Sequence, residues 1–297
     1  MSSQVESITA AAAGTVTLGD TTVNRMGYGA MRITGPGIWG PPKDKSGALT
    51  VLRRVIELGI NFIDTADSYG PGVSEELIAE ALFPYPKDLV IATKGGWNRP
   101  APGHWSHDSS PKHLREALEG SLKRLRLERI ELYQLHTPDP AISFDASVQA
   151  LAEMQREGKI HHIGLSNVTR EHVERARSIA KIVSVQNRYS VFDREWEHVL
   201  DYCEKQKIAF IPWFPLGAGG VGHDTLSRVA EAHKAKPIQI ALAWLLQRSP
   251  IMLPIPGTSS AEHLEEDIAA AAIHLTKEEF HQLDEVNGKT TAGRMRA

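Results

Sequence analysis

Four side chains with complementary acid–base chemistry follow three successive apolar segments of the sequence. Asp64 lies in the segment NFIDTA and Tyr69 follows it by five residues, whereas Lys94 and His136 end the segments LVIATK and ELYQLH. A phenol has a pKa near 10 and is a poor proton donor at neutral pH, but a nearby ammonium stabilises its phenolate form. A carboxylate in turn keeps the ammonium charged, and a neutral imidazole can hydrogen-bond a carbonyl oxygen. The four side chains therefore predict proton transfer at a carbonyl group.

Each of the four residues also has a purely structural interpretation. Asp64 could cap a turn, and Tyr69 could be an ordinary tyrosine at a rim. Lys94 could be a solvated strand end, and His136 could be a hydrogen-bonded histidine of the core. Four unrelated structural roles at neighbouring strand ends would be a far rarer coincidence than one, so the combination of the four residues favours a catalytic site.

The elements that must position these side chains alternate regularly along the chain. Eight short apolar runs are separated by segments with helical periodicity, which predicts an α/β fold of the closed (β/α)8 TIM-barrel class. In such a barrel the active-site residues lie at the carboxyl ends of the strands. The segment 15–23 predicts an N-terminal β-hairpin around Gly19 and Asp20. We expect residues 1–14 to be a flexible tail and residues 15–297 to form a single domain.

The expected element boundaries follow from hydrophobic period, caps and turn residues. The strands are expected at residues 25–31, 61–66, 89–94, 131–136, 161–166, 182–187, 209–214 and 251–257. The helices between them are expected at residues 46–58, 74–83, 110–125, 143–158, 170–180, 194–206, 237–249 and 260–270. Two additional helices are expected outside the repeat, at residues 224–235 and 275–285.

A glycine-rich segment follows the seventh expected strand. Gly217, Gly219 and Gly222 form the pattern G-x-G-x-x-G, the fingerprint of a dinucleotide-binding turn in an open α/β sheet. That turn requires a helix that starts within the glycines and an acidic residue about 20 positions further on. Here this position falls in the apolar segment IALAWLL. We therefore interpret the match as a coincidence of a glycine-rich loop.

The composition argues against several other classes of function. The chain has 297 residues, 41% of them hydrophobic, with a net charge of -3 and a pI near 6.5. These values predict binding neither to nucleic acid nor to an anionic membrane. No apolar run reaches the roughly 18 residues of a membrane span. Cys203 is the only cysteine, so we expect no disulfide framework and a cytoplasmic location. We expect a monomer or a weak homo-oligomer.

The sequence gives little support for a metal site. Asp64 and His136 are too few ligands for a metal-dependent hydrolase, and Lys94 beside them disfavours a cation. His161 and His162 are adjacent on an expected strand, where successive side chains point to opposite faces, so they should form a poor ligand pair. We therefore predict no bound metal.

Taken together, these motifs resemble those of the aldo-keto reductase superfamily. NFIDTADSYG resembles the family's Asp–Tyr motif, and IATKGG and LYQLHTPDP are similar to the segments that carry its lysine and histidine. GLSN, VQNRYS and LPIPGTSSAEHLEED follow in the family's order, so the resemblance covers about residues 15–285. Two segments, GYGAMRITGPGIWGPP and ALAWLLQRSP, are also similar to a bacterial subgroup that includes pyridoxal reductases.

The resemblance implies a mechanism and a cofactor. NADPH would lie across the barrel mouth and pass a hydride to a carbonyl carbon, while Tyr69 gives a proton to the oxygen. Lys94 and Asp64 would tune the pKa of Tyr69, and His136 would position the carbonyl. The residues expected to bind the cofactor are Gly29, Ala30, Met31, Asp64, Ser166, Asn167, Gln186, Trp213, Phe214, Pro215, Leu216, Gly217, Gly257, Thr258, Ser259, His263, Glu266 and Asp267.

Four positions depart from the family's pattern, and the first is Trp213, which stands where the family often has a tyrosine that stacks on nicotinamide. Phe214 stands where a serine is usual and removes a hydroxyl that could reach the pyrophosphate. Gly257 and His263 stand where some members carry a lysine and an arginine for the 2′-phosphate of NADPH. His263 is a weaker anion partner than arginine at neutral pH. NADPH remains the expected cofactor, with NADH not excluded.

The expected substrate is a small carbonyl compound. Trp39, Trp97 and Trp105 lie in two loops that should border the barrel mouth, which favours a flat or aromatic carbonyl compound such as pyridoxal. The short polar C-terminal segment predicts an open cleft. An alternative is a cofactor-binding sensor with slow turnover, because the β subunits of potassium channels are similar to this family. The complete set of Asp64, Tyr69, Lys94 and His136 favours an enzyme.

Overall fold

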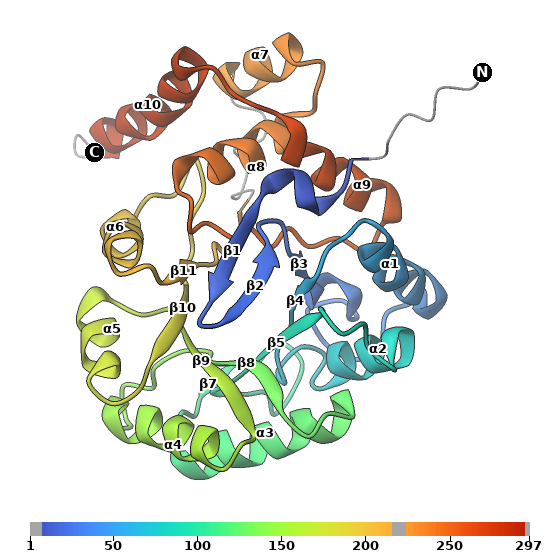
Figure 1. The fold of residues 1–297 in the computed structure, drawn as a ribbon, viewed down its shortest axis with the longest axis vertical. Coiled ribbons are helices and arrows are strands. Elements are labelled where there is room, and N and C mark those ends of the chain that lie inside the picture. The colour runs from blue at the N-terminus through green and yellow to red at the C-terminus, as the bar shows by residue number, and fades with distance from the viewer. Residues whose placement is uncertain (1–7, 216–223, 295–297) are drawn as a thin grey trace.

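A curved parallel sheet forms the centre of the molecule. The computed structural model describes residues 8–215 and 224–294. Seven parallel strands are hydrogen-bonded in the order β11-β10-β9-β8-β5-β4-β3 (Figure 1). They are β3 (Tyr28–Gly29), β4 (Phe62–Asp64), β5 (Val90–Gly95), β8 (Ile130–Leu135), β9 (Ile160–Ser166), β10 (Ile182–Gln186) and β11 (Ala209–Phe210). Each strand lies within or beside a segment for which the sequence predicts one.

The eighth expected strand closes the barrel although it is not a regular strand. In segment 251–257, Leu253 N donates to Phe210 O (2.8 Å), and Phe210 N donates to Ile251 O (2.9 Å). On the other side, Pro254 O accepts from Gly27 N (2.9 Å), and Pro256 O accepts from Gly29 N (3.0 Å). Proline has no backbone N–H, so this segment cannot form a full ladder with both neighbours. The predicted (β/α)8 barrel is confirmed, with an irregular last strand.

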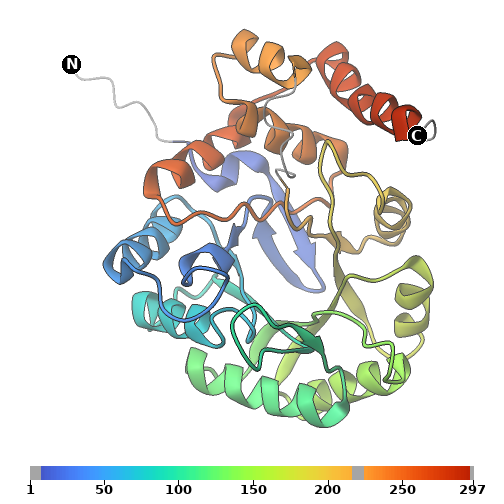
Figure 2. The ribbon, with the colours of Figure 1, turned by 180° about the vertical axis from the view of Figure 1, so that it is seen from behind.

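Helices surround the sheet on its outer face (Figures 1 and 2). Several begin at the side chain of a residue that caps the first free N–H groups: Asp44, Ser110, Ser143, Thr169 and Ser260. The helices of the repeat are α1 (Lys45–Glu57), α2 (Val73–Leu82), α3 (Pro111–Leu125), α4 (Phe144–Arg156), α5 (Arg170–Arg177), α6 (Glu197–Gln206), α8 (Pro237–Arg248) and α9 (Ala261–Ala269). A 3-10 turn, η4 (Ala270–Ala272), continues α9.

Alternation along the strands divides the buried apolar residues into two clusters. One lies inside the barrel and includes Phe62, Val90 and Leu132. The other lies between the sheet and the helices and includes Ile63 and Ile91. Because successive strand side chains point to opposite faces, neighbours such as Phe62 and Ile63 belong to different clusters. The inside of the barrel is therefore filled, and a ligand can enter only at a strand end.

The N-terminal hairpin covers one end of the barrel (Figure 1). Its strands, β1 (Thr15–Leu18) and β2 (Thr21–Asn24), pair antiparallel, and Leu18 and Val23 join the cluster inside the barrel. The expected flexible tail 1–14 differs from the structure in its second half. Residues 10–13 form a 3-10 helix, η1 (Ala10–Ala13), in which Ala10 is buried and its N–H donates to Leu58 O (2.9 Å). The fold therefore begins before the hairpin.

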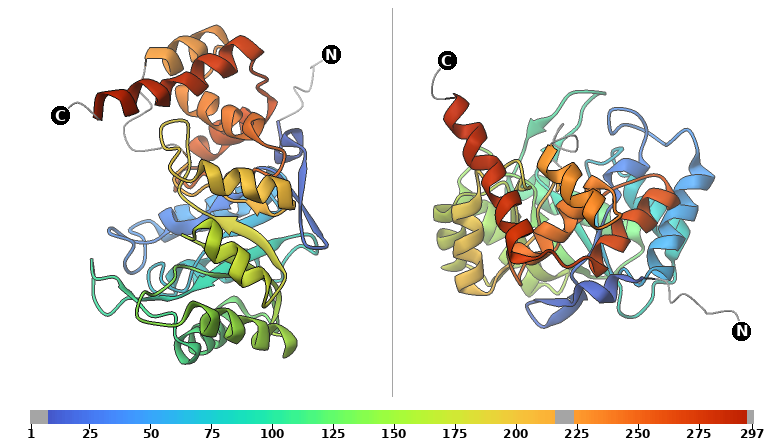
Figure 3. Two further views of the ribbon diagram at one scale, coloured as in Figure 1. Left: turned by 90° about the vertical axis from the view of Figure 1, so that its left-hand side faces the viewer. Right: turned by 90° about the horizontal axis from the view of Figure 1, so that it is seen from above.

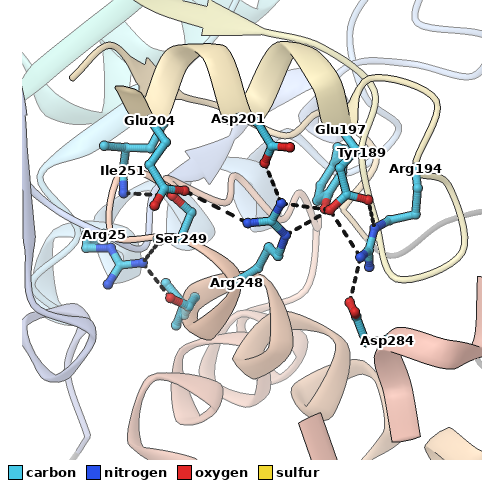
Figure 4. Close-up of polar contacts among 11 residues, drawn as sticks. Arg25, Tyr189, Arg194, Glu197, Asp201, Glu204, Arg248, Ser249, Ile251 and Asp284 are labelled. Carbon is cyan, nitrogen blue, oxygen red and sulfur yellow. Dashed lines mark hydrogen bonds and ion pairs between the residues drawn. The ribbon is translucent and has the colours of Figure 1, made fainter. Parts of the chain in front are cut away.

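The two additional helices lie together beside the barrel (Figure 3). They are α7 (Asp224–Ala232) and α10 (Lys277–Arg294). A network of ion pairs fixes α10 to α6 and α8 (Figure 4). Arg194 contacts both Glu197 on α6 (2.7 Å) and Asp284 on α10 (2.6 Å), and Arg248 on α8 contacts Glu197 (2.8 Å). Burial alone would raise the pKa of Glu197, but these two guanidinium groups lower it below its ordinary value.

A short hairpin stands at the opposite end of the barrel from β1 and β2. Its strands are β6 (Trp97–Asn98) and β7 (Ser106–His107), which follow β5. Arg99 supports this hairpin, because its guanidinium lies 3.6 Å from the ring centre of Trp105 and donates to Ser68 O (3.0 Å). The hairpin thus forms one wall above the carboxyl ends of the strands.

Candidate active site

The carboxyl ends of the strands surround a cavity of about 660 Å³. All the expected catalytic residues except Lys94 line it, and Lys94 lies directly behind Asp64 and Tyr69. Ten residues expected to bind the cofactor also line it: Gly29, Met31, Asp64, Ser166, Asn167, Gln186, Trp213, Phe214, Pro215 and Gly257. The structure therefore brings together side chains that lie far apart in the sequence.

Asp64 and Lys94 form a buried ion pair beneath the cavity. Lys94 Nζ lies 2.5 Å from Asp64 Oδ1 and 2.9 Å from Thr65 O. The other carboxylate oxygen, Oδ2, accepts hydrogen bonds from Gln186 Nε2 (2.8 Å) and Gln134 Nε2 (3.0 Å). Burial alone would lower the pKa of Lys94, but the Asp64 carboxylate and the Tyr69 hydroxyl together outweigh it and hold that pKa above its ordinary value. Lys94 is therefore a fixed cation.

The hydroxyl of Tyr69 faces this cation. Tyr69 lies in the turn between β4 and α2, and its Oη is 3.5 Å from Lys94 Nζ. We expected Lys94 to lower the pKa of Tyr69, but the net shift is upward because burial of the phenol outweighs the nearby ammonium. Lys94 thus limits the rise in the pKa of Tyr69 that burial causes. At neutral pH the phenol keeps its proton, as a proton donor must.

His136 stands beside Tyr69 as a neutral imidazole. The two rings meet edge to face with their centres 5.8 Å apart, and Ser68 Oγ lies 3.4 Å from His136 Nδ1. Burial, and then the charge of Lys94, keep the pKa of His136 well below its ordinary value. A neutral imidazole here can donate a hydrogen bond to an oxygen in the cavity without adding a second full positive charge.

An indole forms part of the cavity wall opposite these residues. Trp213 Nε1 donates to Asn167 Oδ1 (3.0 Å), and Asn167 Nδ2 donates to the backbone oxygen of His136 (3.0 Å). Asn167 has a φ of 56°, a left-handed conformation that asparagine tolerates better than most residues. These bonds fix the plane of the indole, as a platform for a flat ring requires.

A second cavity of about 360 Å³ lies beside the first one. Gly257 lines both, and the second is also lined by four residues that the sequence predicts to bind the cofactor: Thr258, His263, Glu266 and Asp267. Asp267 is buried, and its Oδ1 has no hydrogen-bond partner among the described residues. Burial, with the charge of Glu266, raises the pKa of Asp267 to about 7. An elongated ligand can therefore extend from the first cavity into the second.

Several expected binding residues lie elsewhere. The side chain of Ala30 is buried, Ser259 is exposed, and neither lines the two cavities. Trp97 and Trp105 line the first cavity, whereas Trp39 lies outside its wall, 5.4 Å from the guanidinium of Arg99. Leu216 and Gly217, together with the rest of the glycine-rich pattern, lie outside the described residues.

The sequence interpretation missed several contributors to this region, among them Gln134, Arg32 and Lys236. Gln134 precedes His136 by two residues, so strand alternation already indicated that both face inward. Arg32 follows the predicted residue Met31 and lines the first cavity. Lys236 lines the second cavity and forms an ion pair with Glu266. No local pattern marks Lys236, because it comes from the start of α8 and not from a strand end.

Comparison with known proteins identifies the family. The model of the Aldo/keto reductase family matches residues 25–288. The chain belongs to the aldo/keto reductase family. An uncharacterized oxidoreductase of Schizosaccharomyces pombe is 50% identical over 280 residues, which covers 94% of this chain and 91% of the relative. The pyridoxine 4-dehydrogenase of Escherichia coli is 47% identical over 281 residues, which covers 92% of this chain and 98% of the relative.

Solved structures of the same family share the fold of this aldo/keto reductase. An aldo/keto reductase from Klebsiella pneumoniae in complex with NADP and acetate is 27% identical and superimposes with a TM-score of 0.79, covering 92% of this chain and 95% of that chain. The protein is an NAD(P)H-dependent oxidoreductase. None of the helices in the described part of the chain has the length and apolar character that crossing a bilayer requires.

Proposed function

We propose that this aldo/keto reductase uses NADPH to reduce flat aromatic aldehydes of the pyridoxal class to their alcohols. The observation that carries the proposal is the position of the Tyr69 hydroxyl, 3.5 Å from the buried ammonium of Lys94 and at the wall of a cavity. Trp97 and Trp105 border the same cavity and offer ring faces to a flat substrate. The relative named pyridoxine 4-dehydrogenase supports the choice of substrate class.

The residues around the two cavities fit a dinucleotide. The amides of Asn167 and Gln186 can hydrogen-bond a carboxamide, and the indole of Trp213 can stack on a nicotinamide ring. In the second cavity, the unpartnered oxygen of Asp267 can bond a base, and the ammonium of Lys236 can face a phosphate. When bound, the reduced nicotinamide supplies a hydride to the carbonyl carbon.

The chain itself supplies the proton and orients the substrate. Tyr69 donates the proton of its Oη to the carbonyl oxygen, and the ammonium of Lys94 stabilises the phenolate that remains. Asp64 keeps Lys94 charged through their 2.5 Å contact. His136 directs a hydrogen bond at the carbonyl oxygen before transfer, which places that oxygen near Tyr69.

A preference for NADPH over NADH rests on two basic side chains of the second cavity. Lys236 and His263 both line it, so a 2′-phosphate there would gain a charged partner that NADH could not use. Lys236 takes the place of the lysine and arginine that the family resemblance led us to seek after strand eight. Its ion pair with Glu266 holds the ammonium in position.

The fold holds Cys203 as a buried free thiol, which fits the proposed cytoplasmic location.

The variant Tyr69→Phe tests the proposal. Loss of the proton donor should lower kcat for pyridoxal by roughly 10²- to 10⁴-fold, while the Kd for NADPH changes little. Turnover is followed by the loss of nicotinamide absorbance, and cofactor binding by fluorescence titration. The matched control is Tyr202→Phe on α6, which removes an exposed hydroxyl bonded to Arg177 (2.8 Å) and should leave kcat unchanged.

Two outcomes would contradict this proposal. Wild-type turnover in Tyr69→Phe would refute the role of Tyr69 as the proton donor. Tight binding of NADPH by the wild type, without oxidation across a panel of aromatic and aliphatic carbonyl compounds, would instead favour the sensor that was considered as an alternative.

A further inference from the structure

A cluster of three potential metal ligands lies at the end of the barrel away from the active site. Asp20 lies in the turn between β1 and β2, and His161 and His162 are the second and third residues of β9. Asp20 Oδ1 lies 2.7 Å from His162 Nε2, and Asp20 Oδ2 lies 3.5 Å from His161 Nε2. One ligand atom from each of the three residues lies within 4.8 Å of the others.

The two histidines were expected to form a poor ligand pair because their side chains should point to opposite faces, but the structure places the two rings side by side. Their backbone positions do alternate, yet the rings are stacked with centres 4.0 Å apart and planes inclined by 20°. Both residues lie near the start of β9, and both imidazoles contact Asp20 of the hairpin. The hairpin comes very close here, because a Cβ atom at Gly19 would overlap the ring of His162.

A fourth residue orients one of the rings. Glu131 Oε1 lies 2.5 Å from His161 Nδ1, and Thr21 Oγ1 donates to the same carboxylate oxygen (3.1 Å). A carboxylate at Nδ1 holds a proton on that nitrogen and directs the lone pair of Nε2 away from it. Nε2 of His161 then faces the carboxylate of Asp20, with 3.5 Å between the two atoms. A cation at this point would bind both.

We propose that Asp20, His161 and His162 form a binding site for a divalent transition metal ion of the Zn²⁺ class. Imidazole nitrogen and carboxylate oxygen are usual Zn²⁺ ligands at about 2.0–2.2 Å. A tetrahedral site with such bonds has ligand atoms about 3.3–3.5 Å apart. The 3.5 Å separation of Asp20 and His161 already matches this spacing. The 2.7 Å contact of Asp20 with His162 must lengthen as the metal replaces its proton.

The surroundings allow an ion to enter and hold it in place. The side chain of Asp20 is 70% exposed and can adjust, whereas that of His162 is 8% exposed and fixed. Glu131 acts from behind His161, an arrangement common among zinc-bound histidines. Water can complete the fourth position. The bound ion would join the hairpin to β9 and stabilise the closed end of the barrel, with no part in the reaction at the other end.

The experiment measures Co²⁺ binding to the full chain without an added histidine tag. We expect the absorption bands of tetrahedral Co²⁺ to saturate at one ion per chain and to disappear when Zn²⁺ is added. Asp20→Ala and His161→Ala should each abolish the bands, and Glu131→Gln should weaken binding about 10- to 100-fold. Zn²⁺ should raise the Tm of the wild type but not of Asp20→Ala. Reduction of pyridoxal should not change in these variants.

His281→Ala is the matched control. His281 also contacts a carboxylate, that of Glu285 (3.2 Å), but both are exposed on α10. The control variant should therefore bind Co²⁺ like the wild type. Unchanged Co²⁺ spectra in both Asp20→Ala and His161→Ala would refute the site, and so would the absence of tetrahedral bands from the wild type. In either case the cluster joins the hairpin to β9 by hydrogen bonds alone, without a metal.

Discussion

Replacing Asp64 by asparagine should change the pH dependence of catalysis. In the wild type, the Asp64 carboxylate 2.5 Å away, with a smaller contribution from Tyr69, holds the pKa of Lys94 above its ordinary value, although Lys94 is fully buried. Asparagine keeps the shape of the side chain and removes its charge. Burial then outweighs the remaining contribution of Tyr69, and burial can lower the pKa of a lysine by about 3–5 units, down to the neutral range. Lys94 should lose its proton within the working pH range of the enzyme.

The expected loss of kcat/KM in Asp64→Asn follows from the fraction of Lys94 that stays charged. One pKa unit corresponds to about 1.4 kcal/mol, or a tenfold change in the fraction of the charged lysine. Above the lowered pKa of Lys94, kcat/KM of Asp64→Asn should therefore fall about tenfold per pH unit. In the wild type the pKa of Lys94 is raised, so its charge is present below about pH 10.4 and is lost only above the raised value.

The assay is a profile of kcat/KM for pyridoxal reduction from about pH 6 to pH 10, with the NADPH Kd measured at each pH. Removing one member of a buried ion pair should also cost about 3–5 kcal/mol of the free energy of unfolding, so the variant is assayed well below its Tm. Asp145→Asn is the control, because Asp145 forms an exposed pair with Arg175 (2.9 Å). A variant profile that stays parallel to the wild type across this range would refute the role given to the Asp64–Lys94 pair.

Two further changes test other parts of the structure. Lys236→Ala should weaken NADPH binding by roughly 10- to 100-fold and leave NADH binding nearly unchanged, as measured by fluorescence titration. The reason is that only NADPH carries the 2′-phosphate that the ammonium of Lys236 can face. Equal losses for both cofactors would contradict this. Glu197→Gln should lower the free energy of unfolding in urea by about 2 kcal/mol at neutral pH, because its contacts to Arg194 and Arg248 lose their charge. The folded-state pKa of Glu197 is lowered, so its contribution to the free energy of unfolding exists above about pH 4.3 and disappears as the pH falls further. If the difference in the free energy of unfolding between the wild type and Glu197→Gln stays constant in acid, charge is not its cause.

The sequence by itself determined the order and kind of almost every element. Period-2 and period-3.6 patterns and helix caps such as Ser110 are local, so they can be recognised without knowing the fold. The same order placed Asp64, Lys94 and His136 at the ends of strands, which a parallel barrel brings to one face. The proline-rich segment 251–257 shows the limit of this approach, because its apolar pattern predicted a strand that its missing N–H groups keep irregular.

Only the tertiary structure decided which distant groups meet and at what distance. Asp20 and His162 are 142 residues apart and Gln186 and Asp64 are 122 apart, so no local pattern could pair them. Lys236 likewise enters the second cavity from the start of a helix. The pKa of Tyr69 depends on the balance between burial and the charge of Lys94, and burial exists only once the barrel has closed. Residue types and their order are local properties of the chain, whereas distance and desolvation are set by the packing of all its segments.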